Sequence, residues 1–244
     1  MVYQHDLSGQ VVLVAGASSG MGKATAIAAA EAGAQVVLAA RNAAALEQIV
    51  ASIKQKGGSA LAVATDMLNR DDVDHLIETI LQSYGRITTV VYSVGTNLPR
   101  RTIGELTTES WANMIAVNLT TAFHLTQAVL PIFRKQEEGL LIYISSSSAK
   151  RPDRSGISYQ AGKTGIVGLA HGTMEEEREH GIRTTVIFPG LTDTPLVLKR
   201  PKPTPPEVMA HALQPEDVAE SCLFVMSLPA RAHVPELTLY PSRL

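Results

Sequence analysis

A tyrosine and a lysine stand four residues apart, at Tyr159 and Lys163, in a stretch whose composition predicts a helix. Residues at i and i+4 lie one turn apart on the same helix face, so the phenol and the ammonium group would be neighbours. A free tyrosine has a pKa of about 10, and a nearby ammonium group lowers that pKa by stabilising the phenolate. The pair is therefore a candidate acid–base centre, although an ordinary pair of helix-surface residues would show the same spacing.

Two further polar features could assist such chemistry. Ser146 belongs to a run of four serines after an apolar segment and lies thirteen residues before Tyr159. A serine hydroxyl there could polarise a carbonyl oxygen, while a polar turn would have the same composition. Asn118 interrupts a predicted core-facing helical stripe, whose other members are Trp111, Ile115, Ala122, Leu125 and Val129. A buried amide needs hydrogen-bond partners, so Asn118 is either part of a site or a structural core group.

A glycine-rich segment near the N-terminus indicates a phosphate site. Gly16, Gly20 and Gly22 follow an apolar run and precede an alanine-rich helix, with the spacing G-x-x-x-G-x-G. Glycines in such a turn let the backbone approach a pyrophosphate at the positive end of a helix dipole. The segment therefore predicts a dinucleotide site, and the alternative is a tight strand-to-helix turn that binds nothing.

The residues after the second apolar run favour one dinucleotide over another. Sites for NAD usually carry an acidic residue about 20 positions beyond the glycine loop, where it binds the ribose 2′-hydroxyl. This sequence has Arg41 and Asn42 there. A guanidinium group suits a 2′-phosphate through charge-assisted hydrogen bonds, so we expect NADP(H) rather than NAD(H).

These residues require a scaffold, and the pattern of the chain supplies one. Short runs rich in Val, Ile and Leu occupy residues 11–15, 36–40, 60–65, 89–93, 140–145, 184–188 and 237–240. Helix-length segments separate them, including residues 23–32, 43–56, 71–84 and 109–130. Apolar strands that alternate with helices predict a parallel sheet of about seven strands covered on both faces. We therefore expect an α/β fold with one doubly wound Rossmann-type domain over residues 1–244.

Composition narrows the class of protein. The chain has 244 residues, of which 45% are hydrophobic, and its formal net charge is −2, which argues against disorder and against general nucleic-acid binding. The single cysteine, Cys222, excludes an intrachain disulfide, and the histidines form no H-E-x-x-H motif, so we expect no metal site. No leader or uninterrupted membrane-spanning segment is evident, which predicts a cytoplasmic protein without membrane contact.

With these motifs the sequence resembles the short-chain dehydrogenase/reductase family from residue 11 to the helix at Asp217. The family's T-G-x-x-x-G-x-G motif differs here only in its first residue, Ala15. The resemblance implies that the catalytic residues are Asn118, Ser146, Tyr159 and Lys163. It implies a cofactor site made of Gly16, Ser18, Ser19, Gly20, Met21, Gly22, Arg41, Asp66, Met67, Gly95, Tyr159, Lys163, Pro189, Gly190, Thr192 and Thr194.

The resemblance also implies a mechanism, which is reversible hydride transfer between nicotinamide and a carbonyl or alcohol carbon. Tyr159 would give or take the proton, and Ser146 would hydrogen-bond the substrate oxygen. Lys163 would hold the nicotinamide ribose and lower the pKa of Tyr159, while Asn118 would hold a water in a proton path to Lys163. Asp66 would contact adenine, and residues 189–194 would hold the carboxamide. Two segments depart from the family pattern, the N-N-A-G motif, replaced by residues 92–95, and the V-D-G-G ending, absent from residues 237–244.

Several of these residues follow predicted strands and would therefore gather at the carboxyl edge of the sheet, where such folds bind ligands. They are Gly16, Arg41, Asp66, Gly95, Ser146 and Pro189. Five prolines between residues 195 and 206 exclude a regular helix or central strand. Because this segment leaves the same edge, residues 191–213 are predicted to form a substrate lid, and the alternative is a stiff surface loop.

The substrate stays open at this point. Basic residues exceed acidic ones near the predicted edge, at positions Arg100, Arg101, Lys150, Arg151, Arg154, Lys199, Arg200 and Lys202. This excess suggests an anionic substrate or carrier, such as a carboxylate, a CoA thioester or an acyl-carrier protein, unless the charges are merely solvated. A 3-oxoacyl carrier-protein reductase, a small-alcohol or sugar dehydrogenase, and a non-catalytic dinucleotide-binding sensor or scaffold are the alternatives.

Assembly has one sequence signal. The predicted helix from residue 158 contains Gly165, Gly168 and Gly172, on the side opposite Tyr159 and Lys163. Each glycine in a helix costs about 0.8–1 kcal/mol relative to alanine, and close approach of another helix would explain three of them. We therefore expect a homodimer or homotetramer.

Overall fold

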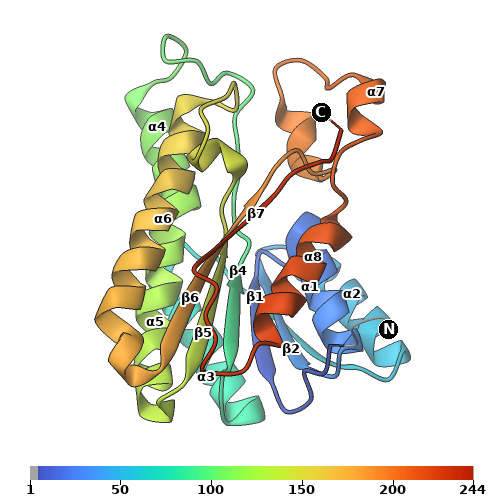
Figure 1. Cartoon of the computed structure of the whole chain (residues 1–244), viewed down its shortest axis with the longest axis vertical. Coiled ribbons are helices and arrows are strands. Elements are labelled where there is room, and N and C mark those ends of the chain that lie inside the picture. Colours follow the sequence, from blue (N-terminus) through green and yellow to red (C-terminus); the bar gives the residue numbers. More distant parts are fainter. Residues whose placement is uncertain (1–4, 244) are drawn as a thin grey trace.

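Seven parallel strands form the centre of the computed structural model, which describes residues 5–243 (Figure 1). The strands are β1 (Val11–Ala15), β2 (Gln35–Ala40), β3 (Ser59–Ala64), β4 (Thr89–Tyr92), β5 (Gly139–Ile144), β6 (Ile182–Pro189) and β7 (Glu236–Leu239). Each lies within two residues of its predicted position. The prediction of a doubly wound parallel sheet is confirmed, because buried strands of this kind read as continuous apolar runs.

The strand order is β3-β2-β1-β4-β5-β6-β7. The first strand of the chain is therefore an inner strand, with β2 and β3 added on one side of it and β4 to β7 on the other. After β3 the chain returns to place β4 on the other side of β1. The connections that leave β1 and β4 therefore diverge, and a crevice opens between them at the carboxyl ends of the strands. The candidate chemistry of the sequence falls at this edge.

Helices cover both faces of the sheet and enclose two hydrophobic cores. On one face lie α1 (Gly20–Glu31), α2 (Ala43–Gln55) and α8 (Pro215–Met226), and on the other α3 (Arg70–Tyr84), α5 (Thr121–Gln136) and α6 (Ile157–Glu177). The shorter helices are α4 (Thr108–Ile115) and α7 (Pro206–Met209). Helix α1 is rich in alanine, which allows close packing against α8.

The long helix predicted over residues 109–130 is interrupted. A π-helical turn, Ala116–Thr120, separates α4 from α5, and α5 extends to Gln136. A π turn inserts one extra residue and rotates the preceding segment relative to the following one. Asn118 and Met114 are fully buried as a result, whereas Trp111 is 38% exposed. The prediction that Trp111 faces the core was therefore wrong.

A tyrosine fastens the π turn to the sheet. The hydroxyl of Tyr92, at the end of β4, lies 2.6 Å from Thr121 Oγ1 and donates to the Val117 carbonyl at 3.3 Å. Thr121 Oγ1 donates to the same carbonyl at 2.7 Å. The residue at position 92, where the chain departs from the family pattern, thus connects β4 to the helical stretch that carries Asn118.

The continuous helical stretch Thr108–Gln136 is long and apolar enough to cross a membrane when judged by length and composition. A core helix passes the same test. In this fold the stretch packs against the sheet through residues that include Leu125, Val129 and Phe133.

The proline-rich segment forms a flap, which we define as residues 191–213. It contains a 3₁₀ turn, Pro195–Lys199, and the short helix α7 (Figure 1). Its two ends are paired, because Leu213 N donates to Leu191 O at 2.9 Å and Asp193 N donates to Leu213 O at 2.8 Å. The flap therefore leaves the sheet edge after β6 and returns to the same place before α8.

The three glycines of α6 have different surroundings. A Cβ atom on Gly165 would lie 2.5 Å from Leu119 Cδ2, so this glycine allows close packing within the chain. Gly168 and Gly172 are exposed, and a Cβ atom on either would meet nothing within 4 Å. Gly165 is therefore explained by packing within the chain, and only Gly168 and Gly172 still leave space for a second chain.

Candidate active site

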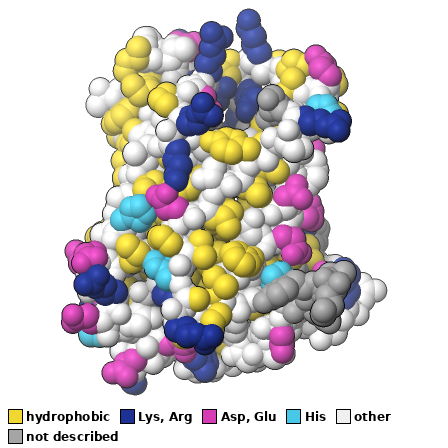
Figure 2. All heavy atoms as spheres, in the orientation of Figure 1, with side chains coloured by type: hydrophobic (Ala, Val, Ile, Leu, Met, Phe, Trp, Pro, Cys, Tyr) yellow, Lys and Arg dark blue, Asp and Glu magenta, His cyan; other side chains and the backbone are white. Residues whose placement is uncertain are grey.

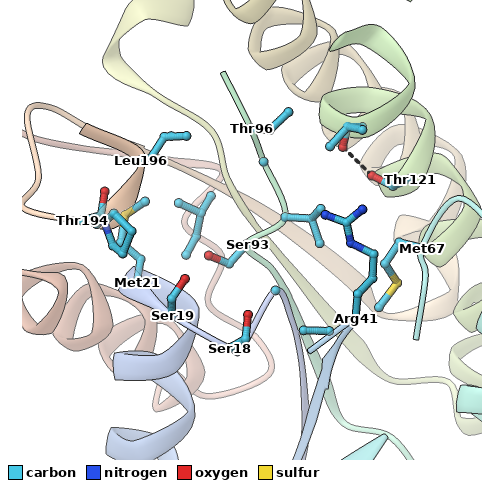
Figure 3. Close-up of a pocket in the computed structure, with 18 of the residues that line it drawn as sticks. Ser18, Ser19, Met21, Arg41, Met67, Ser93, Thr96, Thr121, Thr194 and Leu196 are labelled. Carbon is cyan, nitrogen blue, oxygen red and sulfur yellow. Dashed lines mark hydrogen bonds between the residues drawn. The ribbon is translucent and has the colours of Figure 1, made fainter. Parts of the chain in front are cut away.

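A cavity of about 340 Å³ opens at the carboxyl ends of the central strands (Figure 3). It brings together twelve of the predicted cofactor residues: Gly16, Ser18, Ser19, Gly20, Met21, Arg41, Asp66, Met67, Gly95, Tyr159, Lys163 and Thr194. Figure 3 shows Ser18 and Ser19 in the turn before α1, and Arg41 beside Met67 at the end of β2. Segments far apart in the sequence therefore meet where the crevice was expected.

The glycine turn has the shape that a pyrophosphate site requires. Gly16 has a φ of +85°, and a Cβ atom there would lie 2.7 Å from Ser93 O. A Cβ atom on Gly22 would lie 2.3 Å from Gly16 O. Ser19 is the N-cap of α1, but its side chain makes no capping hydrogen bond. The first amides of α1 thus lack a side-chain cap, and the backbone is close enough to the cavity for a phosphate group.

Lys163 is a buried ammonium group beside this cavity. Its Nζ donates to Ile144 O, at the end of β5, at 3.0 Å. It also donates to Val94 O, just after β4, at 3.4 Å. Burial lowers the pKa of Lys163 to about 8. A Cβ atom on Gly95 would lie 3.1 Å from Nζ, so the absence of a side chain there leaves room for the ammonium group.

Asn118 connects the loop after β4 to the π turn. Its Oδ1 accepts from Thr96 N at 3.0 Å, and its Nδ2 donates to Met114 O at 2.9 Å. The side chain is fully buried and lies beside Gly95, where a Cβ atom would be 3.2 Å from Oδ1. Both halves of the amide therefore hold backbone groups that shape the wall of the cavity.

Tyr159 is 8% exposed, and burial raises its pKa to about 12. Hydrogen bonding to Ser146 opposes this increase, Asp153 adds to it, and Arg200 opposes it. The Lys163 Nζ lies 5.9 Å from the centre of the tyrosine ring. The expected lowering of the Tyr159 pKa by Lys163 is not found: burial has the largest effect on this pKa, and Lys163 is not among the groups that shift it.

Ser146 is oriented by its neighbour in the serine run. Its Oγ accepts from Ser148 Oγ at 2.9 Å and from Ser148 N at 3.2 Å, which leaves its own hydroxyl hydrogen to donate. Ser145 has a different task, since its Oγ donates to Lys163 O at 2.8 Å and joins the end of β5 to α6.

A second cavity of about 110 Å³ adjoins the first and shares five lining residues with it, namely Met21, Ser145, Tyr159, Thr194 and Leu196. Four predicted residues line only this cavity, namely Ser146, Pro189, Gly190 and Thr192. Gly22 and Asn118 line neither cavity.

No pattern in the sequence indicates the contact between the flap and the rest of the site. Lys199 Nζ, in the flap, donates to Thr96 Oγ1 at 2.7 Å, across the first cavity. Of the basic residues noted in the sequence, Arg101, Lys199 and Arg200 line the cavities. Lys150 instead forms an ion pair with Glu236, so its charge is already neutralised.

Several known proteins are similar to this chain in sequence and in fold. Residues 10–204 match the family model of the short chain dehydrogenases. An uncharacterized oxidoreductase of Staphylococcus aureus (strain USA300) is 34% identical over 96% of this chain and 98% of its own length. A 3-oxoacyl-[acyl-carrier-protein] reductase of Synechocystis sp. is 34% identical over 93% of each chain.

Solved structures that contain nicotinamide cofactors also resemble this chain. A 3-ketoacyl-(acyl-carrier-protein) reductase from Brucella melitensis, complexed with NADH, has a TM-score of 0.87 and 26% identity over 98% of this chain and 99% of its own. A metagenomic short-chain oxidoreductase, in complex with NADP, has a TM-score of 0.84 and 29% identity over 97% and 99% of the two chains.

We expect the buried ammonium group to make stability depend on pH. The pKa of Lys163 is about 8 in the folded protein, against an ordinary value of 10.5. Between these values the unfolded chain binds the additional proton, so the contribution of Lys163 to the free energy of unfolding rises with pH. Urea unfolding between pH 8 and 10 should therefore show the wild type gaining stability relative to Lys163→Met. Replacing the exposed Lys135 by Met is the control, and a Lys163→Met difference that is constant or falls with pH would contradict the expectation.

Proposed function

This chain belongs to the short-chain dehydrogenase family and is an NAD(P)-dependent oxidoreductase, and from this premise we propose that it reduces a carbonyl group with NADPH through Ser146, Tyr159 and Lys163. One observation carries the proposal. Tyr159 lines both cavities, so the proposed proton donor adjoins the dinucleotide crevice and the smaller cavity beyond it. A substrate in the smaller cavity would lie next to the donor.

The dinucleotide supplies the hydride when it is bound. The pKa of Tyr159 lies far above neutral pH, at about 12, so the phenol is protonated there, which is the form that donates to the oxygen of a carbonyl under reduction. Ser146 retains its own hydroxyl hydrogen and would hydrogen-bond the same oxygen. Lys163 would hold the nicotinamide ribose, and Asn118 would hold a water in a proton path to Lys163.

The remaining cofactor residues have separate tasks in this proposal. The turn from Gly16 to Gly22 and the first amides of α1 would hold the pyrophosphate. Asp66 and Met67, after β3, would contact the adenine. Residues 189–194 would hold the nicotinamide carboxamide at the border of the two cavities, and the flap would close over the substrate as a lid.

The preference for NADPH rests on Arg41. Its side chain is exposed at the end of β2, lines the cavity beside Met67, and belongs to none of the ion pairs found within residues 5–243 (Figure 3). Its guanidinium group can therefore bind a 2′-phosphate without first losing another partner.

A second candidate is a 3-oxoacyl carrier-protein reductase, which the 34% identity to the Synechocystis protein favours. It would accept a 3-oxoacyl thioester rather than a free carbonyl compound. The match to the oxidoreductases and the retention of Asn118, Ser146, Tyr159 and Lys163 argue against a non-catalytic dinucleotide sensor. Turnover of a thioester, of free carbonyl compounds or of neither separates the three functions.

We also propose that the protein is cytoplasmic and assembles as a homodimer or homotetramer. Gly168 and Gly172 leave an open strip on α6, and Phe123 on the neighbouring α5 is 46% exposed. Apolar side chains also run along the face that carries β7 (Figure 2). Light scattering at micromolar concentration should give the mass of two or four chains, and a clean monomer mass would contradict the proposal.

Removing one hydroxyl group tests the proton donor. Tyr159→Phe keeps the buried ring and should abolish turnover, because no phenol remains to protonate the substrate oxygen. Binding of NADPH, measured by calorimetric titration, should stay within about threefold of wild type, since the binding contacts proposed for the cofactor are otherwise intact. Tyr84→Phe is the matched control. Normal turnover in Tyr159→Phe would remove this residue from the mechanism.

Thermal unfolding with either dinucleotide tests the role of Arg41. A ligand that binds the folded state raises the midpoint according to its affinity, so NADPH should raise it more than NADH at equal concentration. Arg41→Ala should weaken NADPH binding by about 10- to 100-fold, as expected for the loss of a charge-assisted contact. Binding of NADH should hardly change, and the exposed Arg231→Ala should change neither. A larger shift with NADH in the wild type would overturn the preference.

A further inference from the structure

Arg101 is a buried cation in the wall of the smaller cavity. Its side chain belongs to a residue that is only 8% exposed, and its Nε is buried without a hydrogen-bond partner. One bond to Ser155 O, at 3.3 Å, is the only hydrogen bond found for its guanidinium group within residues 5–243, and none of the ion pairs there includes it. A guanidinium group has five N–H donors, and a buried charge is costly unless it is paired. The guanidinium group of Arg101 is therefore a buried charge that an anionic ligand would pair.

The fold holds this side chain in place. Gly156 is the N-cap of α6, with a φ of +100°, and a Cβ atom there would lie 2.8 Å from Arg101 Cδ. The Ser155 carbonyl accepts from Asn97 Nδ2 at 2.8 Å as well as from Arg101. Residues 155 and 156, before and at the N-cap of the helix that carries Tyr159, thus contact the Arg101 side chain and fix its position.

Other polar groups of the cavity point to the same kind of ligand. The Ser155 hydroxyl oxygen is buried without a partner, and Arg200 of the flap adds a second cation. Asp153 also lines the cavity, but its Oδ1 accepts from Ser155 N at 2.8 Å and it forms no ion pair with either arginine. Lys and Arg side chains gather at this end of the molecule (Figure 2). The cavity walls therefore carry an excess of positive charge.

Burial and the charge of Arg200 both lower the pKa of Arg101, while Asp153 opposes them. The same two groups act on Tyr159, where Asp153 raises the pKa and Arg200 lowers it. The cations and the proton donor are thus close enough to influence one another. An anion bound between the arginines would relieve their mutual repulsion.

We propose that Arg101, with the Ser155 hydroxyl and Arg200, binds the carboxylate of a short oxo acid whose carbonyl group faces Tyr159 and Ser146. This inference rests on the proposed function and names its substrate class. The substrate carbon gains a hydride from NAD(P)H and its oxygen gains the Tyr159 proton, which yields a hydroxy acid with the carboxylate unchanged.

The dimensions favour a small molecule over a carrier protein. The smaller cavity, of about 110 Å³, has about a third of the volume of the dinucleotide crevice, which is about 340 Å³. Ser146, Tyr159 and Arg101 line that one space, so a single short molecule can reach all of them. An acidic carrier would meet the exposed flap first, and its surface carboxylates could not reach a guanidinium group that is this deeply buried.

Paired substrates test the inference. Pyruvate and acetoacetate are compared with pyruvamide and acetoacetamide, which have nearly the same shape without the charge. We expect at least one acid to exceed its amide by about tenfold in kcat/KM, because the amide cannot form the charge-assisted fork. Arg101→Met should lower kcat/KM for that acid by about 30-fold or more, mainly through KM, and leave the amide within about threefold.

Two further variants secure the interpretation. Arg101→Lys keeps the charge but not the planar fork, so its loss for the acid should be smaller, and it replaces Arg101→Met if that variant does not fold. Arg100→Met changes an exposed arginine that lines neither cavity and should leave both substrates unaffected. Amides that match or exceed their acids, or an Arg101 variant that lowers acid and amide equally, would overturn the inference.

The test separates this inference from the proposed function. If the wild type reduces benzaldehyde but none of the acids, the carboxylate subsite is wrong and the reductase remains. If it reduces no carbonyl compound while it still binds NADPH, the proposed function fails and the substrate class fails with it. Turnover of acetoacetyl thioesters without turnover of any acid would also reject the subsite and would favour the carrier-protein reductase.

Discussion

The placement of one ammonium group organises the active end of this fold. Lys163 is buried where β4 and β5 end, and backbone carbonyls from both segments accept hydrogen bonds from its ammonium group. Each feature around it follows from that location, since Gly95 must lack a side chain and Ser145 must hold the helix that carries the lysine. Asn118 completes the wall by holding Thr96 N. A buried charge tolerates little error in its surroundings, which explains why these groups are so tightly connected.

The electrostatics of the site favour a protonated phenol over a phenolate. Burial acts on Tyr159 and Lys163 in opposite chemical senses, because it raises the pKa of an acid that becomes charged and lowers that of a base that is charged. The two groups therefore both tend towards their neutral forms. Such a pair suits proton donation to a substrate, and the arginines of the smaller cavity supply the positive charge that would stabilise an anionic reactant nearby.

The sequence predicts the sheet well because each strand is buried on both faces and reads as an apolar run. It also predicts that Tyr159, Lys163 and the glycine turn meet at one edge of the sheet, because each belongs to a motif with a defined spacing along the chain. It fails where geometry depends on contacts between distant segments. The spacing from Trp111 to Val129 is that of a regular helix, so the π turn at Asn118 leaves no trace in it. Charge counts likewise treat Lys150 and Arg101 alike, whereas folding pairs the first with Glu236 and buries the second.

Pairing between Leu191 and Leu213 holds both ends of the flap independently of the residues that lie between them. The two ends are fixed at the sheet edge, so the segment between them can change length without moving Tyr159 or Lys163. The entropic cost of such a change is small, about 0.6 kcal/mol for each doubling of a flexible loop. Engineered variants could therefore exchange the stretch between Thr194 and Leu213, which includes Arg200, while both paired ends and the residues proposed to hold the carboxamide are kept.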